Sequence, residues 1–281
     1  MSSYKIKSYA KINLSLNITG KLKKLHKIES IVSLIDLHDL IFIRKTKDTK
    51  HTISFYGKFS KNINRENTVS KLLYLLDKKK FLSHQKFHIR IKKNIPQKAG
   101  LGGGSMNSAK ILDFFCKKNF IKISKKQKYE ISHSIGSDLI FGINPGSSIL
   151  NSSGIVKNFL NCPVFYTLLV KPKFGCSTKT IYSKVKKFTK SQYNHPKKLM
   201  FSRKYLSTQE NHLENIVFSK YPKLKKIKKF LLEFSNPSFV RMTGSGSVIV
   251  GYYQSKQDCK KAKVKFDRKF KNYWCNTAKT L

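Results

Sequence analysis

A short run of glycines, AGLGGGS at residues 99–105, constrains this chain more than any other segment. It follows an alternating apolar pattern at Phe87, Ile89 and Ile91, which predicts a strand, and it precedes a helical pattern over 107–118. A glycine loop that leads into a helix directs backbone N–H groups and the positive end of the helix dipole toward one point, which suits a phosphate. The segment matches neither GxxxxGK[ST] nor a complete GxGxxG, so a plain tight turn stays open as the alternative.

The first predicted strand, at 6–18, carries a second candidate site. Its apolar residues occupy alternate positions and its polar residues share the other side, so the pattern predicts a half-buried strand. Lys11 and Asn13 are two residues apart and project together from the polar side. A partly desolvated ammonium there would hold positive charge near reacting groups. The alternative is an exposed strand lysine, one of 52 lysines in the chain.

Two further polar motifs stand next to predicted elements. Asp138 lies in GSD at 136–138, after a predicted helix at 125–134 and before an apolar run. The chain has only 14 acidic residues, which favours a specific role for this carboxylate over random surface, although helix capping is the simpler alternative. The segment MTGSGS at 242–247 joins the strands of a predicted hairpin at 239–253. Its backbone could line a phosphate or serve only as a turn.

The formal net charge of +44 invites a nucleic-acid interpretation. Only six of the 58 basic residues are arginine, the residue that phosphate and base-edge contacts usually enrich. The lysines are spread along the whole chain and accompany abundant Ile, Asn, Phe and Tyr, which share AT-rich codons. We therefore favour a solvated, lysine-covered surface and expect no specific nucleic-acid partner.

The length of 281 residues allows about two domains, and the patterns place the boundary near 155, giving 1–155 and 156–281. Strands mixed with helices, several joined by short turns, favour an α+β or mixed α/β fold. No apolar run approaches the roughly 18 residues that span a bilayer, and the five cysteines have no CxxC spacing. These features indicate a cytoplasmic protein with reduced thiols and no membrane partner.

Taken in order, four motifs resemble those of GHMP kinases: SYAKINL at 8–14, GLGGGS at 100–105, GSD at 136–138 and TGSG at 243–246. The resemblance runs from about residue 6 to 253, and PxxxGLGGGS, which begins at Pro96, is its most specific part. It implies a two-domain α+β fold, with an N-terminal ribosomal-S5-like domain and a C-terminal ferredoxin-like domain. It also implies phosphorylation of a small-molecule alcohol by ATP with Mg²⁺.

The resemblance implies a role for each matching residue. Lys11 and Asp138 would form the catalytic pair, Asp138 accepting or orienting the hydroxyl proton and Lys11 stabilising the developing charge. Ser105 would lie near the magnesium ion. The residues implied to bind ATP are Pro96, Gly100, Leu101, Gly102, Gly103, Gly104, Ser105, Asn107, Lys93 and Asn67.

One branch of the family is matched more closely by AKINLSLNITG at 10–20, by His26, and by DLHDL at 36–40. The resemblance implies that its substrate is an alcohol linked to cytidine diphosphate, phosphorylated at the 2-hydroxyl group in isoprenoid-precursor synthesis. His26 would hydrogen-bond the cytosine edge and Tyr182 would stack on the base. The residues implied to bind the substrate are Asn13, His26, Thr178, Tyr182, Gly244 and Gly246.

The sequence departs from the family pattern at three places. Leu25 stands where that branch often has Tyr, which removes one stacking face and leaves more to Tyr182. Met106 replaces a small polar residue, and Leu139-Ile140 replaces a Val-Pro pair. Two other functions remain open: another GHMP kinase, acting on homoserine, mevalonate or a sugar, and a basic RNA-binding protein. We expect a monomer or weak dimer.

Overall fold

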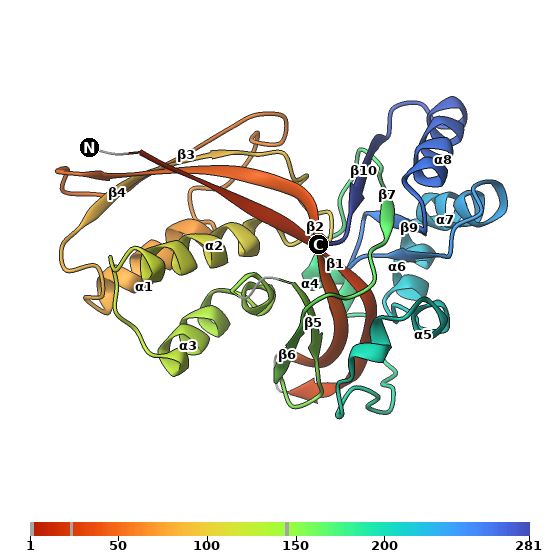
Figure 1. Ribbon diagram of the computed structural model, residues 1–281, viewed down its shortest axis with the longest axis horizontal. Helices are drawn as coiled ribbons and strands as arrows, with labels where there is room; N and C mark the ends of the chain where they lie inside the picture. The colour runs from red at the N-terminus through yellow and green to blue at the C-terminus, as the bar shows by residue number, and fades with distance from the viewer. Residues whose placement is uncertain (1–2, 23–24, 144–145) are drawn as a thin grey trace. The chain divides into compact units, whose positions relative to one another are not determined.

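The computed structural model describes residues 3–22, 25–143 and 146–281 (Figure 1). Its contacts divide the chain into two compact units that alternate along the sequence. Unit 1 contains the described residues of Met1–Ala10, Leu37–Gln97 and Gly102–Pro145, and unit 2 contains those of Lys11–Asp36, Lys98–Leu101 and Gly146–Leu281. Two long strands, β1 (Ser3–Leu22) and β2 (Leu25–Thr46), pair with each other and contribute residues to both units. The division of the chain at 155 stays a prediction.

Unit 1 consists of strands with helices packed beside them. Strands β3 (Thr52–Tyr56) and β4 (Lys86–Lys92) run parallel, and β4 pairs antiparallel with residues 40–46 of β2. Because parallel neighbours need a crossover, the chain passes through a helix between β3 and β4. The helices are α1 (Thr68–Lys78), α2 (Gly103–Lys117), α3 (Lys125–Ile135) and a 3-10 helix (Ser137–Gly142). Figure 1 shows α1 and α2 side by side, and leucines of α1 share one core with isoleucines of β2 and β4.

Unit 2 contains a four-stranded antiparallel sheet in the order β10-β7-β9-β8. Four α-helices lie between β7 and β8 and one lies between β9 and β10, so the sheet has the strand–helix–strand–strand–helix–strand order of the ferredoxin-like fold that the resemblance implied. Residues 30–32 of β2 pair with β5, which pairs with β6. The strands are β5 (Ser147–Leu150), β6 (Val156–Phe159), β7 (Tyr166–Lys171), β8 (Phe239–Met242), β9 (Ile249–Tyr253) and β10 (Trp274–Lys279).

Several helices of unit 2 pack in one apolar core with that sheet. In α7 the buried residues Leu224, Ile227 and Leu231 recur at helical spacing and pack in one core with residues of β7, β8 and β9. Figure 1 shows α7 and α8 beside this sheet. The helices are α4 (Thr178–Tyr182), α5 (Arg203–Ser207), α6 (Glu214–Lys220), α7 (Pro222–Phe234), α8 (Lys256–Lys269) and a 3-10 helix (Lys198–Phe201). No helix within the described ranges is long and apolar enough to cross a bilayer.

The α+β class is confirmed, and two local predictions are corrected. Strand β2 is continuous from Leu25 to Thr46, because the DLHDL segment at 36–40 stays extended. The helix predicted from 107 begins at Gly103, inside the glycine run. The half-buried pattern is wrong for residues 11–17 of β1, since Lys11, Asn13 and their polar neighbours are at most 3% exposed.

Candidate active site

The glycine run forms the start of α2 in unit 1. Gly102 precedes the helix with φ +67°, in the left-handed region that glycine adopts most readily. No side chain of the described residues caps this helix end. The first-turn N–H groups therefore lack a side-chain acceptor, and the helix dipole adds positive potential at the same place. This end of α2 offers a site for an anionic group such as phosphate.

A buried carboxylate, Asp39, connects this helix to β4. It is fully buried and accepts hydrogen bonds from the backbone N–H groups of Asn94 (2.7 Å) and Ile95 (2.9 Å). It also accepts from Asn107 Nδ2 (3.0 Å) and forms an ion pair with Lys93. We call these five residues the Asp39 cluster. The cluster fixes the end of β4 relative to the first turns of α2, within one unit.

Sequence reasoning named two members of the Asp39 cluster, Lys93 and Asn107, but missed Asp39 itself. A Cβ atom at Gly103 would lie 3.4 Å from Lys93 Nζ, so this ammonium is beside the glycine run. Pro96, which opens the motif, follows the Asp39-bound amides directly and is buried. The signal for Asp39 was its place in DLHDL, directly before the apolar run at 40–43 of the same strand, where an ionised group needs partners.

The start of α1 and the GSD segment border the same helix. Asn67 caps α1 by accepting from the N–H groups of Val69 (3.0 Å) and Ser70 (3.2 Å), so it has a structural role and its nucleotide contact stays a prediction. Thr68 Oγ1 would lie 3.1 Å from a Cβ at Gly104. Ser105 Oγ would lie 3.6 Å from a Cβ at Gly136. Unit 1 thus brings Ser105 close to the GSD segment, in which Asp138 occupies the first turn of a 3-10 helix.

In unit 2, the polar side of β1 carries a buried hydrogen-bond network. Lys11 Nζ donates to Asn13 Oδ1 (2.7 Å), and Asn13 Nδ2 donates to Ser30 Oγ (2.8 Å). The backbone N–H of Asn13 donates to Thr243 Oγ1 (3.0 Å). Lys11 is 2% exposed, so the alternative of an exposed strand lysine is wrong. Its ammonium is held in a desolvated polar setting.

Gly100 lies against the turn that joins β8 and β9. Thr243 Oγ1 donates to the Gly100 carbonyl (3.1 Å), and a Cβ at Gly100 would stand 2.0 Å from the Thr243 carbonyl oxygen. Its φ of +75° also favours glycine. A Cβ at Gly244 would meet Gly100 Cα at 3.3 Å, and the Leu101 carbonyl accepts from the Lys11 N–H (3.1 Å). We call the residues Lys11, Asn13, Ser30, Gly100, Leu101, Thr243 and Gly244 the Lys11 cluster.

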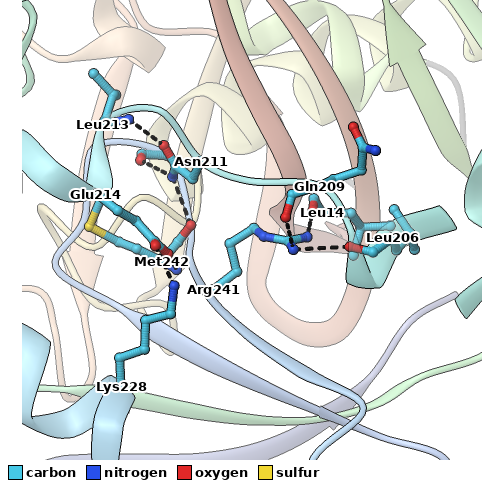
Figure 2. Close-up of polar contacts among 10 residues, drawn as sticks. Leu14, Leu206, Gln209, Asn211, Leu213, Glu214, Lys228, Arg241 and Met242 are labelled. Carbon is cyan, nitrogen blue, oxygen red and sulfur yellow. Dashed lines mark hydrogen bonds and ion pairs between the residues drawn. The ribbon is translucent and has the colours of Figure 1, made fainter. Parts of the chain in front are cut away.

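A second set of polar contacts supports the Lys11 cluster (Figure 2). Buried Arg241 donates to the carbonyl groups of Leu14, Leu206 (3.0 Å) and Gln209. Asn211 Nδ2 donates to the carbonyls of Met242 and Gly244, both at 2.8 Å. Sequence reasoning missed these residues, because their partners are backbone atoms brought near only by the fold.

Figure 2 also shows how the start of the turn is held. The Met242 N–H donates to Glu214 Oε1 (2.6 Å), and Lys228 pairs with the other oxygen of this carboxylate (2.5 Å). The end of β8 and the start of the turn are therefore held by Glu214 of α6, which Lys228 of α7 holds in turn.

Two aromatic residues predicted to bind a base also meet in unit 2. The rings of His26 and Tyr182 have centroids 5.3 Å apart and are tilted by 50°. Thr178 Oγ1 lies 2.8 Å from Ser245 Oγ, which links α4 to the glycine-rich turn containing Gly244 and Gly246. Burial, and secondly the charge of Lys21, lower the pKa of His26 below its ordinary 6.5. Its ring is therefore neutral near pH 7, with one nitrogen donating and the other accepting.

Lys11 belongs to unit 2 and Asp138 to unit 1, and their action as a pair stays a prediction. The structure brings Lys11 together with Asn13, Gly100 and Gly244, and it brings Ser105 close to the segment that carries Asp138. The nucleotide, magnesium and substrate roles of the individual residues likewise stay predictions.

Comparison with known proteins identifies matching families. The chain matches the model "GHMP kinases N terminal domain" over residues 67–150 and "GHMP kinases C terminal" over 186–272. It is 55% identical over 281 residues, 100% of both chains, to a protein of Pelagibacter ubique named 4-diphosphocytidyl-2-C-methyl-D-erythritol kinase.

Solved structures show the same fold. A crystal structure of 4-(cytidine 5'-diphospho)-2C-methyl-D-erythritol kinase matches with a TM-score of 0.78 and 21% identity, over 98% of this chain and 99% of that one. Homoserine kinase from Cytophaga hutchinsonii matches with a TM-score of 0.72 and 16% identity, over 100% and 95% of the chains. At these identities the likeness shows the fold alone.

Proposed function

Because this chain belongs to the GHMP kinases, and within them to the 4-diphosphocytidyl-2-C-methyl-D-erythritol kinase family, we propose that it phosphorylates that cytidyl alcohol with ATP. The product would be the phosphate ester of the substrate's 2-hydroxyl group, in the non-mevalonate route to isoprenoid precursors. The observation that carries the proposal is the Lys11 cluster. In it a desolvated ammonium, an asparagine, the glycine loop at Gly100 and the turn at Thr243 are joined by hydrogen bonds in one unit.

The reaction is a transfer of the γ-phosphoryl group to an alcohol. The hydroxyl oxygen attacks the γ-phosphorus, the bond from that phosphorus to the β–γ bridging oxygen breaks, and ADP leaves. Asp138 would take or orient the hydroxyl proton, and Lys11 would stabilise the negative charge that develops on the oxygen. Such transfers depend mostly on positioning and charge stabilisation, so a few fixed groups suffice. The hydrogen bond from Lys11 to Asn13 (2.7 Å) limits where the ammonium can point.

ATP use follows from family membership, and the structure offers a suitable phosphate site. The left-handed Gly102 and the uncapped start of α2 suit the polyphosphate chain. Lys93 and Asn107, held by Asp39, lie beside that helix start. Mg²⁺ commonly binds substrate phosphates plus one or two protein oxygens, and Ser105 Oγ would supply one. The ion would neutralise phosphate charge when bound.

The cytidyl part of the substrate would bind at His26 and Tyr182. A neutral imidazole matches the hydrogen-bonding edge of cytosine, and the tyrosine ring supplies a stacking face. Homoserine and mevalonate have no base, so this pair favours the cytidyl alcohol over the substrates of other GHMP kinases. A basic RNA-binding function does not require the buried Lys11 and Asp39 clusters, because RNA binds to exposed basic and aromatic side chains.

We further propose that the protein works in the cytoplasm as a monomer or weak dimer, with a small-molecule substrate and no specific nucleic-acid or membrane partner. The dispersed lysines support this, because a net charge of +44 produces weak, salt-sensitive adhesion to polyanions without a dedicated site. Light scattering would measure the mass in solution, and a filter-binding titration against salt would measure RNA affinity.

Phosphorus NMR of the purified protein with ATP, magnesium and the cytidyl alcohol tests the main proposal. We expect a new phosphomonoester resonance, and its loss in Asp138→Asn, since general acid–base groups contribute about 10²–10⁴ in rate. Homoserine and mevalonate are the substrate controls. If the protein phosphorylates either of these and not the cytidyl alcohol, it is a kinase with a different substrate from the one proposed.

A further inference from the structure

A third aromatic ring lies beside His26. Phe188 has its ring centroid 6.5 Å from that of His26, with the planes tilted by 47°. It is 47% exposed, so its ring is accessible to a ligand from outside the chain. No motif or periodicity singles out this residue, because it stands in a lysine-rich stretch without regular secondary structure.

The segment that carries Phe188 is tied down on its C-terminal side. The next residue, Thr189, donates from its backbone N–H (2.9 Å) and its Oγ1 (3.3 Å) to the Ile18 carbonyl of β1. Fully buried Glu29 then accepts from the N–H groups of Gln192 (2.8 Å) and Tyr193 (3.2 Å). Tyr193 is itself fully buried. The ring therefore stays exposed although the adjoining backbone is anchored.

Leu25, next to His26 in sequence, offers no ring. It is 73% exposed, and a leucine cannot provide the flat π surface on which a base stacks. Around His26 the chain thus presents aromatic faces from Tyr182 on α4 and from Phe188 on the anchored segment.

We propose that Phe188 is a specificity-determining residue of the substrate site, providing the pyrimidine base with an aromatic face that position 25 does not supply. This rests on the proposed function, because it assumes that a base binds at His26. The neutral His26 ring would hydrogen-bond the edge of the base while the phenyl ring contacts its face. ATP, bound at the glycine loop, would not depend on Phe188.

The test measures KM for the cytidyl alcohol and for ATP in Phe188→Ala and Phe188→Leu, with CDP binding by calorimetry alongside. Base–aromatic stacking is worth a factor of about five to a hundred in affinity, so we expect KM for the cytidyl alcohol and Kd for CDP to rise about five- to thirtyfold. KM for ATP should not change. Phe188→Leu separates stacking from apolar contact, because it keeps an apolar side chain and removes the ring.

The matched control is Phe234→Ala, another exposed phenylalanine of unit 2 (55% exposed), which should leave both KM values unchanged. Adding Leu25→Tyr to Phe188→Ala should restore much of the lost affinity by returning a ring next to His26. Normal cytidyl turnover with unchanged KM and CDP affinity in both Phe188 variants would overturn the inference and leave the proposed function intact. If the wild-type protein neither turns over the cytidyl alcohol nor binds CDP, the proposed function fails with it.

Discussion

The Asp39 cluster and the ring group of His26, Tyr182 and Phe188 are built in opposite ways. Asp39 is fully buried and bonded to two backbone amides and two side chains, so each member depends on the others. The ring group is half-exposed. The ring centroid of His26 lies 5.3 Å from that of Tyr182 and 6.5 Å from that of Phe188. A buried polar cluster tolerates little change, because each lost partner leaves an unsatisfied group. An exposed ring can be lost without leaving an unsatisfied polar group, and a ring at another position of the chain can supply the same stacking face.

The contrast predicts what a substitution does at each site. The glycine loop, Lys93 and Asn107, which the family resemblance selected, are linked by Asp39 or packed beside it. Position 25, where the chain departs from the pattern, lies in the exposed region. Substitutions should therefore reduce stability at the first site and alter substrate affinity at the second.

The largest effect is expected for Asp39→Ala. Breaking a buried ion pair by removing one partner costs about 3–5 kcal/mol, because it leaves Lys93 charged, buried and unpaired. Urea unfolding would measure the loss, with Asp48→Ala as control, because that aspartate is 56% exposed and pairs only with His88 among the described residues. A loss below about 1 kcal/mol would contradict the dependence of this cluster on one carboxylate.

Lys11→Met should lower kcat by a factor of about 10²–10³, the usual effect of removing one group that stabilises transition-state charge. Methionine has a similar length and no charge, so the fold should survive with Asn13 Oδ1 missing one donor. The matched control is Lys7→Met, an exposed lysine of the same strand. Steady-state kinetics with both substrates would measure kcat for the two variants. Equal kcat values would show that Lys11 has no role in the reaction.

His26→Ala should raise KM for the cytidyl alcohol about tenfold while KM for ATP stays the same, since a lost hydrogen bond and ring contact are worth roughly 1–2 kcal/mol. A good control is His133→Ala, because His133 also contacts a tyrosine, Tyr129 at 4.4 Å, but lies on α3 in unit 1. Equal changes in the two KM values would undermine base recognition at His26.

The smallest effect is the pH dependence at the same histidine. Burial keeps the pKa of His26 below 6.5, so the neutral ring, with its acceptor nitrogen, persists from about pH 8 down to about pH 6.5. Below that range protonation removes the acceptor, and KM for the cytidyl alcohol should rise. The unfolded chain takes up this proton first, so folding stability should fall slightly over the same range. His26→Gln should have a flat KM profile.

Sequence patterns predicted local structure well where its causes are local. The helix predicted at 125–134 is found as α3 at Lys125–Ile135, because Ser124 caps its start and Gly136 follows its end. The hairpin of β8 and β9 was also predicted, and Met242 pairs with Ile249. The glycine loop was recognised because its spacing is specific.

The errors came from partners far away in sequence. Lys11 and Asn13 looked half-exposed because Thr243, which covers them, lies 230 residues after Asn13. Asp39 was missed because the backbone amides that bind it, those of residues 94 and 95, lie 55 and 56 positions away in sequence. Phe188 has no local signal, since its position beside His26 depends on a loop anchored to Glu29 and Ile18.

The interleaving of the units has a consequence for synthesis on the ribosome. Unit 2 combines 11–36 and 98–101 with 146–281, and its sheet includes β10, which pairs with β7. The N–H of Leu281 donates to the Leu34 carbonyl (2.9 Å), joining residues 247 positions apart. Unit 2 therefore cannot complete its fold while β10 is still in the ribosomal exit tunnel. Until β10 emerges, the apolar side chains of residues 11–36 stay exposed to solvent. Chaperone binding during translation should concentrate on this early segment.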